Sequence, residues 1–226
     1  MGYLPVFLRL DDEPCVVIGG GQVAERKVRA LLEAHARVTV VSSELTPALS
    51  AMSDNGAINH IRRCYQPGDL RGAVLAYVAI GSPEISAKVA AEAHQRAVPI
   101  NVADAPDLCS FISPSVMSRG DLQIAVSTSG ASPTVARTIR QQLEAQYGPE
   151  YAVALEILRA ARRFLYARDL DPRSRARKLG DLAECGLLEC LARGDWAQVE
   201  CIVVDHIGAG LIELGVDPAL FNMDDG

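Results

Sequence analysis

The sequence predicts an α/β fold, in which a doubly wound parallel sheet is followed by a small α+β segment and then by helices alone. As far as Asp107, short β-branched runs alternate with amphipathic helical patterns, which is the rhythm of βαβ units. After Pro149 the strand signals disappear and only helical periodicity remains. With 226 residues, the chain is long enough to bury the core of one such domain and of a smaller appendage.

Composition and charge restrict the class of protein. The formal net charge of -6 argues against nucleic acid as a partner. No apolar run approaches the roughly 20 residues of a membrane span, and the first five residues lack the pattern of a signal peptide. The cysteines form no C-x-x-C pair, and the histidines have no metal-ligand spacing. We therefore expect a cytoplasmic protein, away from the membrane, that holds no metal ion of its own.

The first glycines organise the chain. The β-branched run Val16–Ile18 ends in three glycines, and a helical pattern over 23–34 follows. Gly19, Gly21 and Ala24 fit the G-x-G-x-x-A fingerprint of Rossmann-like, dinucleotide-binding domains. In that fingerprint the first residue permits the turn, the second admits a pyrophosphate, and the third lets the helix pack closely on the strand. The predicted cofactor-binding residues of this turn are Gly19, Gly20, Gly21, Gln22, Val23 and Ala24.

A second strand, over 37–41, follows at the spacing of a βαβ unit and favours the cofactor over an ordinary glycine turn. An acidic residue that binds the adenosine ribose is expected about 20 residues beyond the glycines. No carboxylate stands at the strand end itself, so Ser42 and Ser43 are predicted to bind the ribose, with Glu44 as an alternative. We expect NAD, but the choice between NAD and NADP stays open at this point.

The remaining elements of the first half follow in order. Weak alternation over Val6–Leu10 predicts an additional strand ahead of the nucleotide fold. The run Ala73–Ile80 is almost continuously apolar, which is typical of a strand buried on both faces of a parallel sheet. Pro83 marks the first turn of the next helix. The other predicted elements are a helix over 45–54, a strand over 57–62, a helix over 83–97 and a strand over 98–102.

An acidic residue follows the last of these strands. In a doubly wound sheet, ligands bind outside the carboxyl ends of the strands, and strand 98–102 lies on the side of the crevice away from the adenosine half. Asp104 is therefore predicted to face the nicotinamide and to act in catalysis, although it also suits a turn before Pro106. Asn101 and Val102, at the same strand end, are predicted cofactor-binding residues.

Beyond Asp107 the pattern changes to two strands, 110–119 and 122–128, around a tight turn. A stretch rich in hydroxyl groups then begins a helix, with Ser132 as its N-cap and Pro133 at its first position. Hydroxyl groups, free N–H groups and the guanidinium groups of Arg137 and Arg140 suit either an anion pocket or an ordinary helix cap.

Helices are predicted over the last third of the chain. The stretch 159–178 is rich in cations, which is typical of a solvated helix face or, alternatively, of a lid over an acidic ligand. Gly186 and Gly194 are expected to break the helices, and the tail over 217–226 is expected to fray. The predicted helices are 151–167, 172–181, 182–192 and 196–207.

A set of motifs stands in a fixed order within about the first 147 residues. These motifs are Leu4-Pro5-Val6-Phe7, Val17-Ile18-Gly19-Gly20-Gly21 with Val23-Ala24 and Arg26-Lys27, Asn101-Val102-Ala103-Asp104, Phe111-Ile112-Ser113-Pro114-Ser115 and Ser129-Gly130-Ala131-Ser132-Pro133. Together they closely resemble the N-terminal module of siroheme synthase, a family that acts as precorrin-2 dehydrogenase and sirohydrochlorin ferrochelatase. The likeness continues more loosely through the helical tail.

The resemblance implies a NAD-binding domain over 1–113, a dimerisation and substrate segment over 114–148 and a helical domain over 149–226. It also implies an intertwined homodimer. A carboxylate at the place of Asp104 is essential to both reactions in the family, and the hydroxyl-rich loop belongs to the tetrapyrrole site, where Thr128 departs from the family pattern. The implied substrate-binding residues are Ser113, Ser115, Arg119, Thr128, Ser129, Gly130, Ser132 and Arg137.

The activity that the resemblance implies is NAD-dependent dehydrogenation of precorrin-2 to sirohydrochlorin, followed by insertion of ferrous iron, as a substrate, to give siroheme. Asp104 would accept the protons, and local cations would hold the carboxylates of the tetrapyrrole. The macrocycle supplies the nitrogen ligands of the metal, in agreement with the lack of a His/Cys cluster. Because no methyltransferase segment follows in this sequence, we expect a separate uroporphyrinogen methyltransferase upstream.

Other functions remain open on the sequence. The nearest is a dehydrogenase that leaves chelation to a separate protein, and the sequence does not distinguish iron from cobalt. A non-catalytic NAD-sensing module would leave Asp104 and the hydroxyl-rich loop unexplained. A small hydroxy-acid dehydrogenase would need a histidine base in the catalytic half, whereas His94 lies in mid-helix and His206 in the tail.

Overall fold

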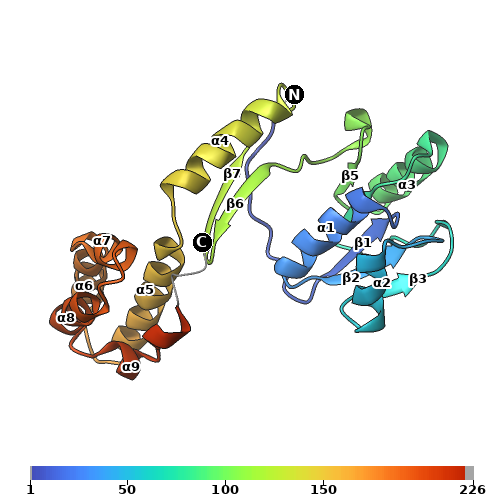
Figure 1. Ribbon diagram of the computed structural model, residues 1–226. Coiled ribbons are helices and arrows are strands. Elements are labelled where there is room, and N and C mark those ends of the chain that lie inside the picture. Colours follow the sequence, from blue (N-terminus) through green and yellow to red (C-terminus); the bar gives the residue numbers. More distant parts are fainter. Residues whose placement is uncertain (1, 222–226) are drawn as a thin grey trace. The chain divides into compact units, whose positions relative to one another are not determined.

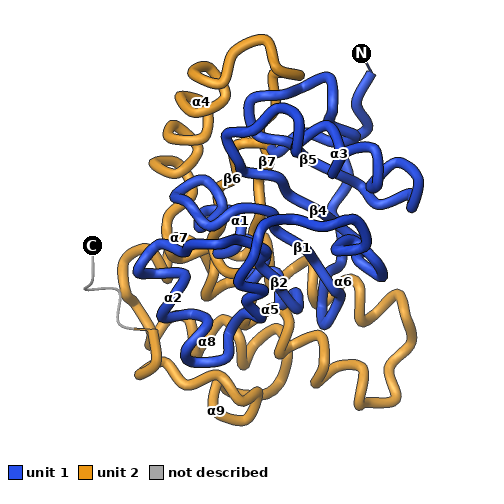
Figure 2. The backbone as a smooth tube through the Cα atoms, turned by 90° about the vertical axis from the view of Figure 1, so that its right-hand side faces the viewer, with its two compact units in different colours: residues 1–113 blue, residues 114–226 orange. Residues whose placement is uncertain are grey.

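The structure, a computed structural model, describes residues 2–221. The chain divides after Ser113 into two compact units, residues 1–113 and 114–226 (Figure 2). Each unit has its own hydrophobic core. The predicted further boundary at residue 148 stays a prediction. Within the described part of the chain, no helix has the length and apolarity needed to cross a bilayer.

The first unit contains a five-stranded parallel sheet in the order β3-β2-β1-β4-β5 (Figure 1). The chain starts in the centre, winds out to one edge, and returns past β1 to build the other half. This topology confirms the predicted doubly wound sheet. The strands are β1 (Pro14–Ile18), β2 (Arg37–Val41), β3 (Asn59–Ile61), β4 (Leu75–Val78) and β5 (Ile100–Val102).

Helices cover both faces of this sheet, which explains the apolar runs of its central strands. In β1, Cys15 and Val17 pack in the cluster that includes residues of α1 (Gln22–Glu33) and α2 (Pro47–Asp54), whereas Val16 and Ile18 pack in the cluster with α3 (Pro83–Gln95). Burial, with a smaller contribution from the nearby Glu13 carboxylate, raises the pKa of the Cys15 thiol to about 11. Cys15 therefore acts as a small apolar core residue.

The predicted strand over Val6–Leu10 is wrong. This segment is irregular, and its side chains Val6, Phe7 and Leu8 are exposed, Val6 to 64% and Phe7 to 70%. A strand needs a hydrogen-bonded neighbour, and within the described residues no strand pairs with this segment. Alternation in the sequence alone cannot provide that neighbour.

The second unit begins with an antiparallel hairpin of β6 (Ser115–Arg119) and β7 (Leu122–Val126), followed by α4 (Pro133–Gln146). The hairpin was predicted, but its first strand begins at Ser115 and not at Ser110. The reason is that Ser110 belongs to the edge of the first sheet, where its N–H donates to the carbonyl of Ile100 over 2.9 Å.

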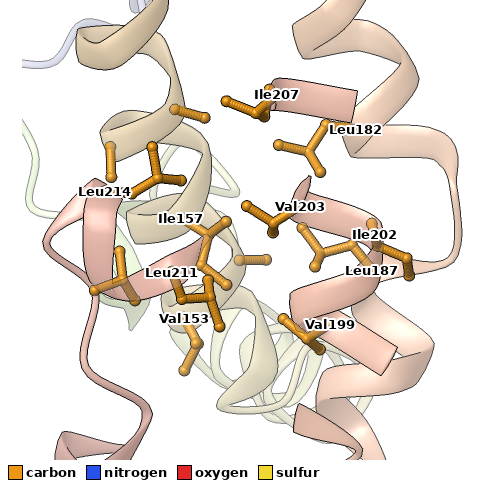
Figure 3. Packing of buried hydrophobic residues seen from close by; sticks show 14 of the residues in the cluster. Val153, Ile157, Leu182, Leu187, Val199, Ile202, Val203, Ile207, Leu211 and Leu214 are labelled. Atoms are coloured by element: carbon orange, nitrogen blue, oxygen red, sulfur yellow. The ribbon is translucent and has the colours of Figure 1, made fainter. Parts of the chain in front are cut away.

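The helices beyond α4 pack around a core of aliphatic side chains, among them Ile157, Val203 and Leu211 (Figure 3). The predicted helix breaks at Gly186 and Gly194 are confirmed, and Gly186 takes φ +84°. The helix end predicted at residue 181 is wrong, because Leu182 is fully buried on a helix that continues to Glu184. The helices are α5 (Glu150–Tyr166), α6 (Pro172–Glu184), α7 (Leu187–Ala192), α8 (Trp196–Ile207) and α9 (Leu211–Leu214). The predicted frayed tail contains a short 3-10 turn, Pro218–Leu220, and otherwise lies largely outside the described residues.

Candidate functional site

The turn after β1 requires its first two glycines for packing. Gly19 has φ +120°, and a Cβ on it would collide with the carbonyl of Ala79. A Cβ on Gly20 would collide with the carbonyl of Glu44. Any side chain at either residue would therefore disturb the loops after β2 and β4, so both glycines are needed by the fold itself.

Gly21 has a different reason to be glycine. Its backbone is extended (φ -86°, ψ -174°), and no protein atom lies within 4 Å of where a Cβ would stand. Gly21 is the N-cap of α1, and no side chain caps this helix end. The first N–H groups of α1 therefore need an external partner. An exposed helix N-terminus without a cap, approached over a bare backbone, fits a pyrophosphate group.

A cavity of about 130 Å³ lies beside this turn, where the strand order reverses between β1 and β4. Of the predicted cofactor-binding residues, Gly19, Ser42 and Ser43 line it. The other lining residues were not predicted, namely Ile18, Val41, Cys64, Tyr65, Ile80, Gly81, Ser82 and Ile85. Ile80, Gly81 and Ser82 follow β4. The rule that ligands bind at the carboxyl ends of strands where the strand order reverses could therefore have identified them. Cys64 and Tyr65 come from a loop that has no such signal.

A second, larger cavity of about 420 Å³ adjoins the first at Ser43, which lines both. Its lining includes Glu44, His60 and Arg62. The hydroxyl of Ser42 donates to the carbonyl of Glu44 over 2.7 Å, so its proton is already in use. Ser43 and Glu44 are therefore better placed than Ser42 to donate to, or accept from, a ribose in this direction.

Tyr65 is held in the cavity wall by a buried carboxylate on α3. The Tyr65 hydroxyl donates to Glu92 over 2.5 Å, the Gly68 N–H donates over 2.9 Å, and Arg96 Nε donates over 2.6 Å. Burial alone would raise the pKa of the Glu92 carboxyl, but the hydrogen bonds from Tyr65, Gly68 and Arg96 outweigh it, and the pKa lies below its ordinary value of 4.5. Burial, together with the hydrogen bond to Glu92, raises the pKa of Tyr65, which stays a neutral donor at pH 7.

We expect Glu92→Gln to destabilise the protein by about 1–3 kcal/mol at pH 7, because a neutral amide cannot accept all three hydrogen bonds. A carboxyl whose pKa is lowered by folding stabilises the fold above its unfolded pKa, and this contribution is lost as the pH falls. The stability difference between wild type and variant should therefore shrink below about pH 4.5. Urea unfolding at pH 7 and pH 3 measures it. Glu84→Gln, on the exposed start of the same helix, is the matched control, and an equal loss there would contradict the role of Glu92.

Asp104 lies at the exposed end of the edge strand β5 and has φ +60°, a left-handed conformation that is uncommon outside glycine. Its carboxylate has no hydrogen bond or ion pair within residues 2–221. The two other residues predicted at this strand end are engaged in contacts within the protein. The side-chain amide of Asn101 donates to the carbonyl of Phe111 over 3.0 Å, and Val102 is buried. The structure does not bring these three residues into the lining of either cavity.

Ser113 takes part in a cluster on the first unit. Lys27 Nζ donates to the Ser113 hydroxyl over 3.0 Å and lies 4.9 Å from the centre of the Tyr77 ring, against which Phe111 packs edge-on. Burial, with help from the charge of Arg26, lowers the pKa of Lys27. These contacts favour a structural role for Ser113, because its hydroxyl fixes the last residue of the unit.

Most of the predicted substrate residues of the second unit lie near one end or the other of α4. At its start, Ser132 accepts from the Val135 N–H as predicted for an N-cap, and the Thr128 hydroxyl bonds both the N–H and the carbonyl of Ser132. Ser129 has φ +52° and Gly130 has φ +86°, so this loop bends sharply at an exposed point. The Thr128 hydroxyl therefore closes the loop.

At the other end of α4, the Arg119 guanidinium donates to the carbonyls of Tyr147 and Glu144 over 3.1 and 3.3 Å. A guanidinium on the free carbonyls of a helix end favours a structural role. Arg140 pairs with Glu144 on the same helix, whereas Arg137 is exposed and has no side-chain partner in the described chain. Ser115 begins β6 opposite Val126.

In the described residues there is no group of three or more His, Cys, Asp or Glu side chains that could hold a metal ion. Polar side chains of the first unit, among them Ser43, His60 and Arg62, instead line the two adjoining cavities beside the glycine turn. Chemically, the turn and the cavities can hold a phosphate-bearing cofactor. The exposed carboxylate of Asp104 lines neither cavity and has no hydrogen bond or ion pair within residues 2–221.

Two protein families match this chain, and the boundary between their matches lies close to the boundary between the two compact units. Residues 6–115 match the family described as putative NAD(P)-binding, and residues 119–146 match the family described as sirohaem biosynthesis protein central. The siroheme synthase of Methylobacillus flagellatus is 44% identical over 166 residues, which make up 72% of this chain and 36% of that protein. The siroheme synthase of Thioalkalivibrio sulfidiphilus is 39% identical over 194 residues, or 86% of this chain and 40% of that protein. The chain thus spans about two fifths of the length of these curated relatives.

Among solved structures, SirC, a precorrin-2 dehydrogenase, matches with a TM-score of 0.74 and 22% sequence identity. The match covers 88% of this chain and all of the SirC chain. This similarity confirms the predicted fold, with its parallel sheet, small antiparallel sheet and helical region.

Proposed function

Because the chain belongs to the siroheme synthase family through residues 6–146, we propose that it is a NAD-dependent precorrin-2 dehydrogenase. The observation that supports this most directly is the uncapped N-terminus of α1 behind the open side of Gly21. The phosphate groups of a ligand could accept hydrogen bonds from the uncapped N–H groups of this helix end. The relatives' names and that of the solved SirC structure then supply the substrate class.

In this proposal the N–H groups after Gly21 bind the pyrophosphate, and Ser43 and Glu44 bind the adenosine ribose, which favours NAD. A carboxylate at this place would repel the additional phosphate of NADP. The cofactor, when bound, supplies the acceptor for a hydride. The residues of this chain orient the cofactor. They also hold the substrate so that its reacting C–H bonds lie near a base.

Oxidation of precorrin-2 to sirohydrochlorin removes two electrons and two hydrogens. One C–H bond breaks with its electron pair leaving as hydride to NAD, and a proton leaves from a neighbouring position. Asp104 is the proposed base for that proton, because its carboxylate is exposed and has no competing partner in the described chain. Insertion of ferrous iron into sirohydrochlorin releases two pyrrole protons, and the same carboxylate is proposed to accept them.

We expect NAD to protect Cys64 from alkylation, because this exposed thiol lines the cavity beside the glycine turn. Cys201, which is also exposed but lies on α8 of the second unit, is the internal comparison. Site-resolved mass spectrometry after brief treatment with iodoacetamide should show at least a fivefold slower modification of Cys64 with saturating NAD, and no change at Cys201. Equal rates at Cys64 with and without NAD would place the cofactor elsewhere.

The assay that tests the proposed function follows the visible spectrum under anaerobic conditions. Precorrin-2 and NAD are mixed with the protein, and ferrous iron is added once sirohydrochlorin has formed. A sirohydrochlorin spectrum followed by a siroheme spectrum supports both steps. Formation of sirohydrochlorin without acceleration of the iron step would identify a dehydrogenase that relies on a separate chelatase. No spectral change with precorrin-2 and NAD would favour a NAD-sensing module.

We also propose that the protein is a homodimer through the hairpin and α4. Both outer edges of the two-stranded sheet are unpaired in the described chain, and Val135 and Ile139, one turn apart on α4, are 48% and 38% exposed. Light scattering should then give twice the chain's mass of 24.2 kDa. Ile139→Glu should raise the dimer dissociation constant at least tenfold, whereas Thr138→Glu, on the neighbouring exposed position, should not. A monomer at all concentrations would exclude this interface.

A further inference from the structure

The thiol of Cys109 lies against both ends of the turn that carries Asp104. Cys109 Sγ accepts the N–H of Val102 over 3.1 Å. It lies 3.3 Å from the carbonyl oxygen of Val102 and 3.4 Å from that of Ala105, to either of which its hydrogen can be donated. Val102 is the last residue of β5, and Ala105 is the first residue after Asp104, so one side chain closes the loop on both sides.

Sheet contacts do not replace these bonds. β5 is an edge strand, and its neighbour β4 serves only one side of it. On the open side, the chain returns after the 3-10 turn Pro106–Leu108. The Ser110 N–H donates to the Ile100 carbonyl over 2.9 Å, and two side chains add to this attachment, Cys109 at the Asp104 turn and the Ser110 hydroxyl at Ile100. The Val102 N–H would face outward with no partner among the described strands if the thiol were removed.

Asp104 depends on this support more than most residues would. Its backbone has φ +60°, which costs free energy that the surroundings must offset. Its carboxylate has no bond to any described residue, so only the backbone of the turn determines where the carboxylate points. The position of the proposed base is therefore determined by what holds residues 102–105.

On this basis we propose that Cys109 is a positioning residue, whose thiol holds the left-handed turn at the end of β5 and so aims the Asp104 carboxylate. The inference rests on the proposed role of Asp104 in proton transfer. Cys109 does not touch the substrate or the cofactor in this proposal. A serine hydroxyl also accepts and donates, so Cys109→Ser should keep the turn, whereas Cys109→Ala should release it.

The experiment compares single-turnover oxidation of precorrin-2 by Cys109→Ala, Cys109→Ser and Ser110→Ala, with the wild type alongside. We expect Cys109→Ala to lower the rate by about ten- to a hundredfold at unchanged NAD affinity, and Cys109→Ser to restore it to within about threefold. Ser110→Ala is the matched control. It removes two side-chain bonds to the backbone of the same strand, one residue further on, without touching the Asp104 turn. Its rate should equal that of the wild type.

A double-mutant cycle separates positioning from a general loss of structure. In the Asp104→Asn background, Cys109→Ala should change the residual rate by less than about twofold, because there is no longer a base to aim. The same loss in both backgrounds, a wild-type rate for Cys109→Ala, or an equal loss with Ser110→Ala would overturn the inference. A wild-type protein that does not oxidise precorrin-2 would overturn the proposed function and this role together.

Amide hydrogen exchange at Val102 reports on the turn independently of activity. This N–H donates to the thiol, so it should exchange at least tenfold faster in Cys109→Ala and return towards the wild-type rate in Cys109→Ser. If the wild type oxidises precorrin-2 and this amide exchanges equally in all three proteins, the thiol does not hold the turn and the inference fails while the proposed function stands.

Discussion

Asp104→Asn should abolish most of the dehydrogenation of precorrin-2 while the fold and the affinity for NAD stay unchanged. Removal of a general base typically costs about a hundred- to ten-thousandfold in rate. The fold should survive because asparagine, like aspartate, tolerates the φ of +60° found here, and because the carboxylate has no bond within the described chain that the amide would lose. Single-turnover kinetics with precorrin-2 and NAD measure the rate, and calorimetric titration measures the NAD affinity.

The matched control for this variant is Asp107→Asn, three residues further along the same loop. Asp107 is exposed in the 3-10 turn, so the substitution makes the same change of charge beside the site without removing the proposed base. The Asp107 variant should keep the wild-type rate. Wild-type turnover by Asp104→Asn, or an equal loss in both variants, would show that the carboxylate at the end of β5 is not the base.

Gly21→Asp should weaken NAD binding by about a hundredfold or more without unfolding the protein. No protein atom lies within 4 Å of a Cβ at this residue, and its φ of -86° suits any amino acid, so the fold has room for the side chain. The new carboxylate would stand where the pyrophosphate approaches. Like charges about 4 Å apart near a protein surface repel by roughly 4 kcal/mol, which is more than the roughly 3 kcal/mol that corresponds to a hundredfold.

Two variants define the outcome of that titration. Gly180→Asp adds the same side chain in open space on α6, far along the chain, and should leave the NAD affinity unchanged. Gly19→Ala should instead destabilise the protein, because its Cβ would collide with the carbonyl of Ala79. Unchanged NAD affinity in a folded Gly21→Asp protein would remove the proposed cofactor site from this turn.

Local sequence signals predicted much of the fold. The strand Arg37–Val41, the Ser132 cap and the helix Trp196–Ile207 agree with the structure because β-branched runs, capping residues and helical periodicity act over a few residues. The strand at Val6–Leu10 was wrong because a strand also needs a neighbour, which alternation does not specify. The break at Gly186 was predicted correctly, but the helix end at residue 181 was wrong because Leu182 is buried by distant helices.

Parts of the candidate site also follow from local sequence, whereas other parts depend on tertiary contacts. The glycine turn follows from its spacing, but Tyr65 is held by Glu92, 27 residues away, and no local pattern indicates that contact. Arg119 was assigned to the substrate on its charge, whereas the structure places its guanidinium on the last carbonyls of α4. A sequence shows that a side chain is charged. It does not show which group that side chain binds, because the binding partner depends on tertiary packing.

Helices α1 and α3 both begin beside the glycine turn, but their first turns are capped differently. α3 is capped by its own Ser82, whereas α1 has no side-chain cap. A bound dinucleotide would act as the missing cap, so ligand binding and the integrity of the first turn of α1 are thermodynamically coupled. At a hundred times its dissociation constant, a ligand that binds only the native state adds about 2.7 kcal/mol to the free energy of unfolding. The concentration of free cofactor would then set the stability of this protein towards unfolding as well as its rate of reaction.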